Sequence, residues 1–365
     1  MSAMAKSFYA ESKVVKNTRV KEELGVVLRY PTYREGLLAQ LIEEEEDAQR
    51  EVDAKNVHHP QESLKPDLVT LVNIGSLKAE PYLDLRQIAF RLSRALRLPV
   101  VPCSFRFSNR VDASLLHNLP AKTLENVLTE SLTTSRHQAD GQGEHRVVIL
   151  PLFFGNSSTL TEFLPKVLRK SWDAGVAAGA QARRLEARVG RCLVDLGSAE
   201  DDRIARILLE KVDLVLGQLS TPSEVSVLVL EHGTPNQEVH EATLAVTSQL
   251  RSVLTAKQSV QRVEHACMER REGAEYDFND PLLEKAIDHY GIKSGVVIVS
   301  LLFFSQGRHA GERGDIDVIV DDLKERYPRL EFRITEPLGA HPTLSEILQD
   351  RYRAACSAAP LHVLP

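Results

Sequence analysis

Two histidines in the second half of the chain stand where metal and proton chemistry could occur. His232 and His309 each follow an apolar run of the kind that forms a buried strand, with Gly233 and Gly307 close by. Glycine at such a point permits a tight turn and a close approach of a ligand to the backbone. Neutral imidazole binds Fe²⁺, Co²⁺, Ni²⁺ and Zn²⁺, and it can also accept a proton. The pair therefore predicts a site that holds a divalent metal and removes protons from a substrate.

One carboxylate could complete this site. Glu269 lies in the segment HACMERREG (265–273), where the second strand of this half should end. A single histidine or glutamate after a strand is more often a turn or surface residue, so the prediction depends on the three residues occurring together. Two further histidines are expected to lie outside the site, with His265 a strand or surface residue and His240 on the solvent-facing side of a helix.

Apolar runs alternate with helical segments from residue 65 onward. Four of these runs are DLVTLVNIG (67–75), RVVILPLFF (146–154), VSVLVLEHG (225–233) and VIVSLLFF (297–304). The alternation predicts an α/β fold with parallel sheets and helices on both faces, and the continuous Val/Ile/Leu runs indicate strands buried on both sides. Ligands of such sheets bind outside the carboxyl ends of the strands, where the two histidines would meet.

The order of the apolar runs repeats, which indicates a duplicated module. DLVTLVNIG corresponds to VSVLVLEHG, VVILPLFF to VIVSLLFF, and LEARV to LEFRI. The predicted organisation is a helical N-terminal extension (1–64), a first α/β half (65–220) and a second α/β half (221–365). The first half carries no histidine at the corresponding strand ends, so its site is expected to be degenerate.

Composition excludes several classes of protein. The 365 residues carry a formal net charge of −6, which gives no global basic field for nucleic acid. The four cysteines form no CxxC pair, which argues against a disulfide framework and indicates a reducing cytoplasm. The apolar runs are too short to span a membrane, and the N-terminus lacks the apolar core of a signal peptide.

Several short motifs give the second half a resemblance to a known family. They are EHGT (231–234), CMER (267–270), LLFFSQGRH with the following GDI (301–309, 314–316), and PLGAHP (337–342). Over about 221 to 350 this half resembles the small sirohydrochlorin chelatases of the CbiX and SirB type, which are class II chelatases. The resemblance implies two tandem flavodoxin-like chelatase modules, of which the first keeps only the framework.

The resemblance also implies an activity. It is the insertion of a divalent metal, cobalt or iron, into sirohydrochlorin or a related reduced tetrapyrrole, a lyase reaction of cobalamin or sirohaem biosynthesis. His232 and His309 would bind the metal and assist loss of the pyrrole N–H protons, with Glu269 supporting proton removal. No cofactor beyond the metal substrate is expected. The residues expected to meet the tetrapyrrole are Gly233, Thr234, Gly307, Arg308 and Arg313.

Departures from the family pattern keep an alternative open. More residues separate His309 from Asp315 than is usual, and Ser300 stands where a proline is expected. These changes affect the expected choice of substrate more than the fold. The alternative function is a carrier or regulatory protein that binds tetrapyrrole or metal without turnover. A duplicated chain holds both faces of a pseudo-dimer, so a monomer or weak homo-oligomer is expected, with no nucleic-acid or membrane partner.

Overall fold

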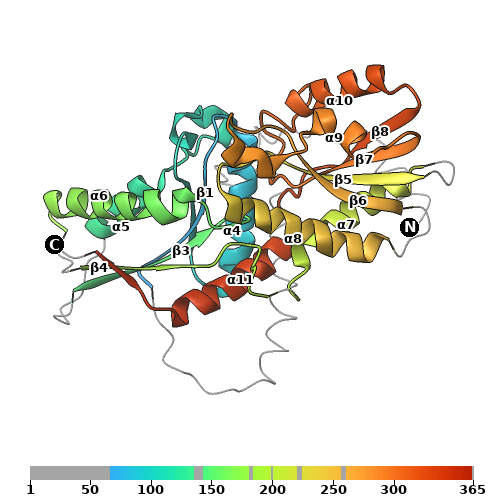
Figure 1. Cartoon of the computed structure of the whole chain (residues 1–365). Coiled ribbons are helices and arrows are strands. Elements are labelled where there is room, and N and C mark those ends of the chain that lie inside the picture. Colours follow the sequence, from blue (N-terminus) through green and yellow to red (C-terminus); the bar gives the residue numbers. More distant parts are fainter. Residues whose placement is uncertain are drawn as a thin grey trace, which may run out of the picture. The chain divides into compact units, whose positions relative to one another are not determined.

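Two largely parallel β-sheets form the framework of the protein in the computed structural model (Figure 1). The structure describes residues 66–134, 143–180, 184–198, 200–219, 224–255 and 260–363. By its internal contacts the chain divides into Met1–Ser63 and Leu64–Pro365. The predicted helical extension, residues 1–64, lies outside the described residues.

The first sheet has the strand order β2-β1-β3-β4-β9. Its first four strands are parallel, and β9 joins β4 in the antiparallel direction. The strands are β1 (Leu68–Asn73), β2 (Val100–Ser104), β3 (Glu144–Pro151), β4 (Arg184–Val189) and β9 (Leu361–Val363). The connecting helices are α4 (Glu80–Leu96), α5 (Leu124–Thr134) and α6 (Leu164–Ala177), with the short helices η1 (Ser108–Arg110), η2 (Ala113–Leu116) and η3 (Thr159–Phe163).

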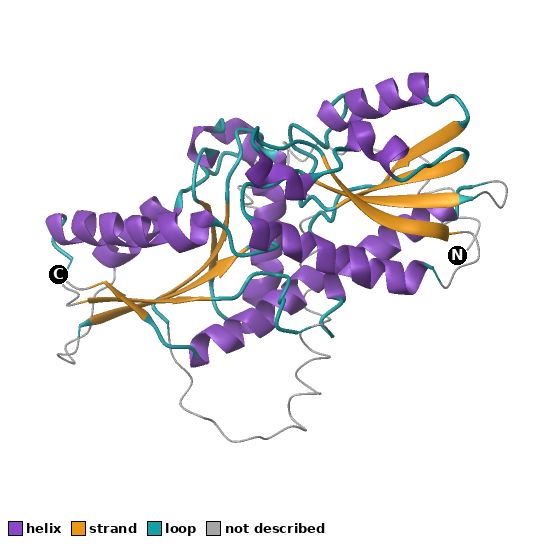
Figure 2. Ribbon diagram, viewed as in Figure 1, coloured by secondary structure: helices purple, strands orange, loops and turns teal. Residues whose placement is uncertain are grey.

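The second sheet repeats this topology with four parallel strands in the order β6-β5-β7-β8. The strands are β5 (Val225–Glu231), β6 (Val260–Cys267), β7 (Gly295–Leu301) and β8 (Leu330–Ile334). The helices are α8 (Gln237–Leu254), η4 (Ala274–Asn279), α9 (Leu283–His289) and α10 (Asp315–Arg326). Helices cover both faces of each sheet (Figure 2). The predicted α/β class with two tandem parallel-sheet modules is confirmed.

The last helix of each module packs against the other module. Helix α7 (Arg203–Leu216) follows β4 in sequence but packs against β7 and α8 of the second module. Helix α11 (Pro342–Ser357) follows β8 but packs against α4, β3 and β4 of the first module. Strand β9 then adds to the edge of the first sheet. The predicted boundary between residues 220 and 221 stays a prediction. Helix α7 precedes it in sequence but packs on the second module, and α11 follows it but packs on the first.

One continuous apolar core joins the two modules. It contains Leu71 and Leu150 from the first sheet, Val227 and Ile298 from the second, and the buried faces of α4, α7, α8 and α11. Separate clusters lie on the outer faces, beneath α5 and α6 in the first module and beneath α9 and α10 in the second. Strands buried on both faces explain the continuous apolar runs of the sequence.

Polar and aromatic contacts reinforce the junction between the modules. The buried Arg351 of α11 donates hydrogen bonds to the carbonyl oxygens of Cys192 and Leu193, each at 2.9 Å, and pairs with Asp201 at 2.9 Å. Phe154 and Phe304, which follow β3 and β7, stack with ring centroids 4.2 Å apart and planes 6° apart. The partners of Arg351 avoid the free-energy cost of burying an unpaired charge.

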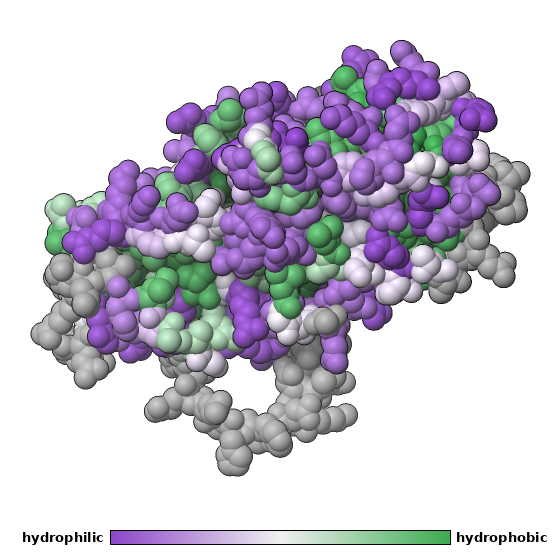
Figure 3. Space-filling model, in the orientation of Figure 1, coloured by the Kyte–Doolittle hydropathy of each residue, from purple (hydrophilic) through white to green (hydrophobic). Residues whose placement is uncertain are grey.

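None of the described helices combines the length and apolar character needed to cross a membrane. The face of the molecule in Figure 3 is largely hydrophilic, with apolar residues in areas interrupted by polar ones.

We expect Phe304→Ala to lower the free energy of unfolding by about 2 kcal/mol, because it removes a partly buried ring and its stacking with Phe154. Urea denaturation of the full chain measures this. The control is Phe90→Ala on α4, whose side chain is 49% exposed and whose loss should cost less than about 0.5 kcal/mol. Equal losses from the two variants would contradict a stabilising role for the stacked pair.

Candidate functional site

The two predicted histidines meet at the carboxyl edge of the second sheet. Strands β5 and β7 are neighbours in parallel register, with Leu230 opposite Leu301, and His232 and His309 lie beyond their ends. The Nε2 atoms of the two rings are 3.2 Å apart, and the ring planes are inclined by 77°. Two nitrogens bound to one ion at about 2.1 Å in tetrahedral geometry would lie roughly 3.4 Å apart. The separation therefore fits two ligands of a single metal ion.

The other nitrogen of each ring faces an acceptor. His309 Nδ1 lies 2.6 Å from Asp315 Oδ2, and His232 Nδ1 lies 3.3 Å from the carbonyl oxygen of Gly233. An acceptor at Nδ1 favours the tautomer that carries its proton there and leaves the Nε2 lone pair free. The two free Nε2 lone pairs then lie close together. A cation bound between them would relieve their repulsion.

Asp315 supports the candidate site, although the sequence alone predicts no role for it. It lies in the GDI segment. It is the first residue of α10, and its carboxylate holds the ring of His309 from behind. An acidic residue at a helix start shortly after a candidate ligand was the available signal, since metal-binding histidines commonly pair their second nitrogen with a carboxylate.

Glu269 joins the pair from the neighbouring strand β6. Its Oε1 lies 3.7 Å from His232 Nε2, and its backbone N–H donates to the carbonyl oxygen of His232 at 3.0 Å. The side chain is 62% exposed, and that of His232 is 45% exposed. The structure thus places His232, Glu269 and His309 together on an accessible surface, with a carboxylate positioned to accept protons.

Gly233 permits this close approach of strands β5 and β6. Its φ is +97°, and a Cβ atom there would lie 1.8 Å from the carbonyl oxygen of Glu269. The first module has the same arrangement, since Gly75 has φ +98° and its Cβ would lie 1.7 Å from the carbonyl oxygen of Arg106. The two modules therefore share the backbone of the site and differ in its side chains.

The predicted substrate-binding residues lie around the histidines in different settings. Thr234 is bound on both sides by Asn279, which accepts from its N–H and donates to its carbonyl oxygen, each at 2.9 Å. Gly307 has φ +66° and faces Pro81 at the start of α4 in the first module. Thr234 therefore holds the loop after β5 in shape, and Gly307 brings the loop after β7 close to the other module.

The two arginines lie on the exposed loop that carries His309. Arg308 is 78% exposed, and its Nε lies 3.8 Å from Asp315 Oδ2. Arg313 is exposed, has φ +56°, and its backbone N–H donates to Asp317 Oδ2 at 2.8 Å. Both side chains are available to an anionic ligand, and their substrate role stays a prediction.

His240 departs from its predicted setting, whereas His265 does not. The prediction that His240 faces solvent is wrong, because it belongs to the buried stripe of α8 with Thr243, Val246 and Leu250. His240 Nδ1 lies 2.8 Å from Oε1 of the buried Glu231. His265 lies in β6 as expected, and burial together with the neighbouring His240 lowers its pKa to about 4.

Two half-open hollows among the described residues are lined by neither His232 nor His309. One of about 440 Å³ is lined by Gly155 and Asn156 after β3 and by Glu238 of α8. The other, of about 330 Å³, is lined by Ser305 after β7 and by Asp84 of α4. Burial raises the pKa of Asp84, with a hydrogen bond from Ser305 acting in the opposite direction. The hollows occupy corresponding places in the two modules, so they follow from the repeated topology, whereas the histidines stand on open surface.

Fold and site together define a chelatase-like α/β protein. Residues 226–355 match the CbiX family model. The fold is similar to that of SirB from Bacillus subtilis, solved with Fe³⁺, with a TM-score of 0.54, 11% identity, and coverage of 80% of this chain and 96% of that one.

Two further solved structures show weaker likeness. SirB from Bacillus subtilis subspecies spizizenii, in complex with cobalt, has a TM-score of 0.48 and 14% identity, covering 80% of this chain and 96% of that one. A multi-domain protein from Deinococcus radiodurans with structural similarity to chelatases has a TM-score of 0.46 and 19% identity, covering 78% of this chain and 55% of that one. The search of curated proteins found no match.

We expect Gly233→Ala to weaken metal binding, because the added methyl group would push the ends of β5 and β6 apart. The control is Gly75→Ala, which makes the same clash in the first module. Both should destabilise the fold by about 1–3 kcal/mol in urea denaturation, but only Gly233→Ala should change the Co²⁺-induced shifts of the His232 and His309 ring protons in NMR spectra. Equal effects of the two variants on those shifts would argue against a site at the second module.

We expect Asp315→Asn to lower the Co²⁺ affinity of the histidine pair by about 10- to 100-fold, because it weakens the partner of His309 Nδ1. The same NMR titration measures this. Asp317→Asn is the matched control, since Asp317 lies in the same first turn of α10 but accepts from the backbone of Arg313. An unchanged affinity in Asp315→Asn would show that the carboxylate does not support the ligand.

Proposed function

We propose that the protein inserts a divalent metal, Co²⁺ or Fe²⁺, into sirohydrochlorin or a related reduced tetrapyrrole. The observation that carries this proposal is the pair of Nε2 atoms 3.2 Å apart, each in a ring whose Nδ1 faces an acceptor. The match of residues 226–355 to the CbiX family model supports it. A fold shared with SirB is consistent with the same reaction.

The chemistry is a proton-for-metal exchange. The ion binds to Nε2 of His232 and His309, and the macrocycle lies over it with its pyrrole nitrogens facing the ion. Two N–H protons leave as the ion enters the ring, so the charges balance without a redox step. The exposed carboxylate of Glu269, 3.7 Å from His232 Nε2, accepts one of these protons and passes it to solvent, and the other goes to an imidazole that the ion has left or to water.

An open surface suits this substrate better than an enclosed pocket. Sirohydrochlorin is a flat macrocycle with eight carboxylate groups, which need water or cationic partners at the rim. Arg308 and Arg313 stand exposed beside the histidines, and guanidinium groups bind carboxylates with two parallel hydrogen bonds. The arginines orient the ring through its periphery while the histidines act at its centre.

The first module supplies no second metal site in this proposal. At the positions of His232 and Glu269 it has Ile74 and Arg106, whose backbones make the corresponding hydrogen bond at 3.0 Å. An alkyl group and a guanidinium cannot bind a metal cation. One catalytic site per chain follows, with the first module serving as the framework against which the second is built.

We expect His232→Ala and His309→Ala each to abolish turnover, and Glu269→Gln to lower its rate by about 100-fold, the lower range for loss of a general base. A timed absorbance assay with sirohydrochlorin and Co²⁺ or Fe²⁺ measures this against the uncatalysed rate. His289→Ala is the control, because His289 is exposed at the end of α9, away from the strand ends that form the site.

Two outcomes of this assay decide between enzyme and carrier. Many turnovers per chain support the chelatase, and a metal-competition series then distinguishes cobalt from iron, hence cobalamin from sirohaem biosynthesis. Binding of one tetrapyrrole per chain with no rate above the uncatalysed reaction would overturn the chelatase in favour of a carrier. Full activity in both histidine variants would overturn the assignment of the site.

A further inference from the structure

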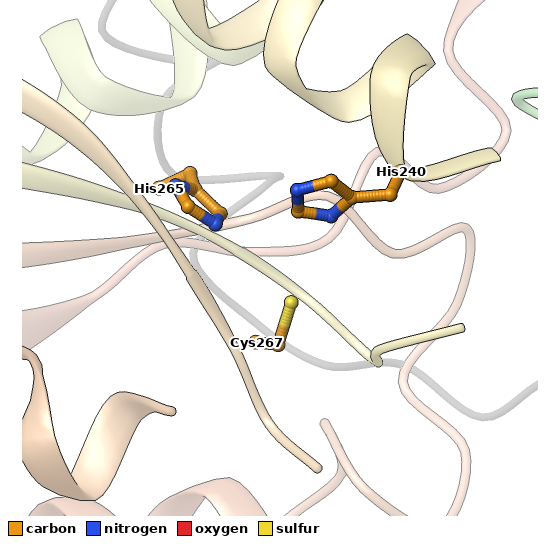
Figure 4. Close-up of side chains that lie close together, drawn as sticks. All are labelled: His240, His265 and Cys267. Atoms are coloured by element: carbon orange, nitrogen blue, oxygen red, sulfur yellow. The ribbon is translucent and has the colours of Figure 1, made fainter. Parts of the chain in front are cut away.

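A second group of side chains that could bind a metal lies largely buried in the same module. It comprises His240 of α8 with His265 and Cys267 of β6, and one ligand atom from each lies within 4.8 Å of the others. The rings of His240 and His265 lie edge to face, with planes inclined by 70°, and the sulfur of Cys267 points toward the space between them (Figure 4). These residues lie on the face of β6 that α8 covers, a contact the topology requires.

A buried carboxylate extends this group to four donors. Glu231, the last residue of β5, places Oε1 2.8 Å from His240 Nδ1 and 3.4 Å from Cys267 Sγ. Its other oxygen accepts from the hydroxyl of Thr243 at 3.0 Å. Glu231 is 6% exposed, His240 3% and Cys267 fully buried. Carboxylates are rarely buried this deeply without a cationic or metal partner.

His265 carries an unsatisfied polar atom in this group. Its Nε2 is buried and has no hydrogen-bond partner among the described residues. Buried polar atoms are nearly always paired, so each exception points to something that occupies its lone pair or takes its proton. A hydrogen-bonded network alone accounts for Glu231, His240 and Thr243 but leaves this nitrogen unexplained.

We propose that Glu231, His240, His265 and Cys267 bind one divalent ion of the Zn²⁺ class as a structural site. Two nitrogens, one thiolate and one carboxylate are a donor set that borderline ions favour. Their atoms would lie roughly 3.3–3.6 Å apart around a tetrahedral ion, so modest side-chain rotations close the site. Binding displaces the thiol proton of Cys267, as coordination to a dication does.

The site differs in kind from the surface pair. Its four donors come from the protein and are buried, which leaves no open position for a substrate, as in structural zinc sites. Glu231 directly precedes His232, and Cys267 lies two residues before Glu269. An ion at this place fixes the ends of β5 and β6, which carry two of the three residues of the surface site.

The experiment uses the full-length double variant His232→Ala/His309→Ala, in which the surface pair is removed. Expressed in medium supplemented with Co²⁺ and purified, it is expected to retain one ion per chain by metal analysis. Its spectrum should show a near-ultraviolet thiolate-to-cobalt charge-transfer band and the intense visible bands of tetrahedral Co²⁺. Cys267→Ser added to this background should remove the charge-transfer band, and Cys192→Ser, another buried cysteine, should leave it.

Failure of this proposal is separate from failure of the proposed function. A folded double variant that retains no ion, or an ion without the charge-transfer band, overturns the buried site whatever the turnover of the unmodified protein. This test needs only the His232→Ala/His309→Ala variant to fold, which circular dichroism establishes. It does not depend on whether the Cys267 variant folds.

Discussion

The site depends on the parallel register of β5 with its two neighbours. Because β6, β5 and β7 run in the same direction, their carboxyl ends reach one edge of the sheet and deliver Glu269, His232 and His309 to one place. The backbone contact between Gly233 and Glu269 then sets how closely two of these ends approach. Every other feature of the site, including the ring orientations and the supporting carboxylate, operates within that geometry.

Much of this arrangement could be predicted from the sequence because it follows from strand direction. Alternating apolar and helical segments indicate parallel strands, and residues directly after such strands must share an edge, so the meeting of His232 and His309 needed no knowledge of packing. The exchange of α7 and α11 could not be predicted, because an amphipathic helix does not encode which of two similar sheets it covers. The burial of His240 was readable from the 3.6-residue periodicity of α8, which places it in line with Thr243 and Leu250.

The two modules share their framework and differ in the side chains at the strand ends. Both keep a glycine with positive φ against a carbonyl oxygen and the same strand order, and both bury one face in the common core. They differ at the exposed strand ends, where Ile74 and Arg106 stand in place of His232 and Glu269. Side chains at such ends make few packing contacts, so they can change without cost to the core. The exchanged helices make each module incomplete without the other.

A metal destined for a substrate and a metal that braces a fold need opposite environments. In the proposed function, the surface pair offers two imidazoles at one exposed edge, a set that would hold a dication while leaving positions open for pyrrole nitrogens. Strong thiolate or multiple carboxylate ligands there would oppose release of the ion into the macrocycle. The donors of the proposed buried site include a thiol and a carboxylate shielded from water, where electrostatic attraction is strong and exchange would be slow. If both proposals hold, one ion would stay in the fold while the other passes to the substrate.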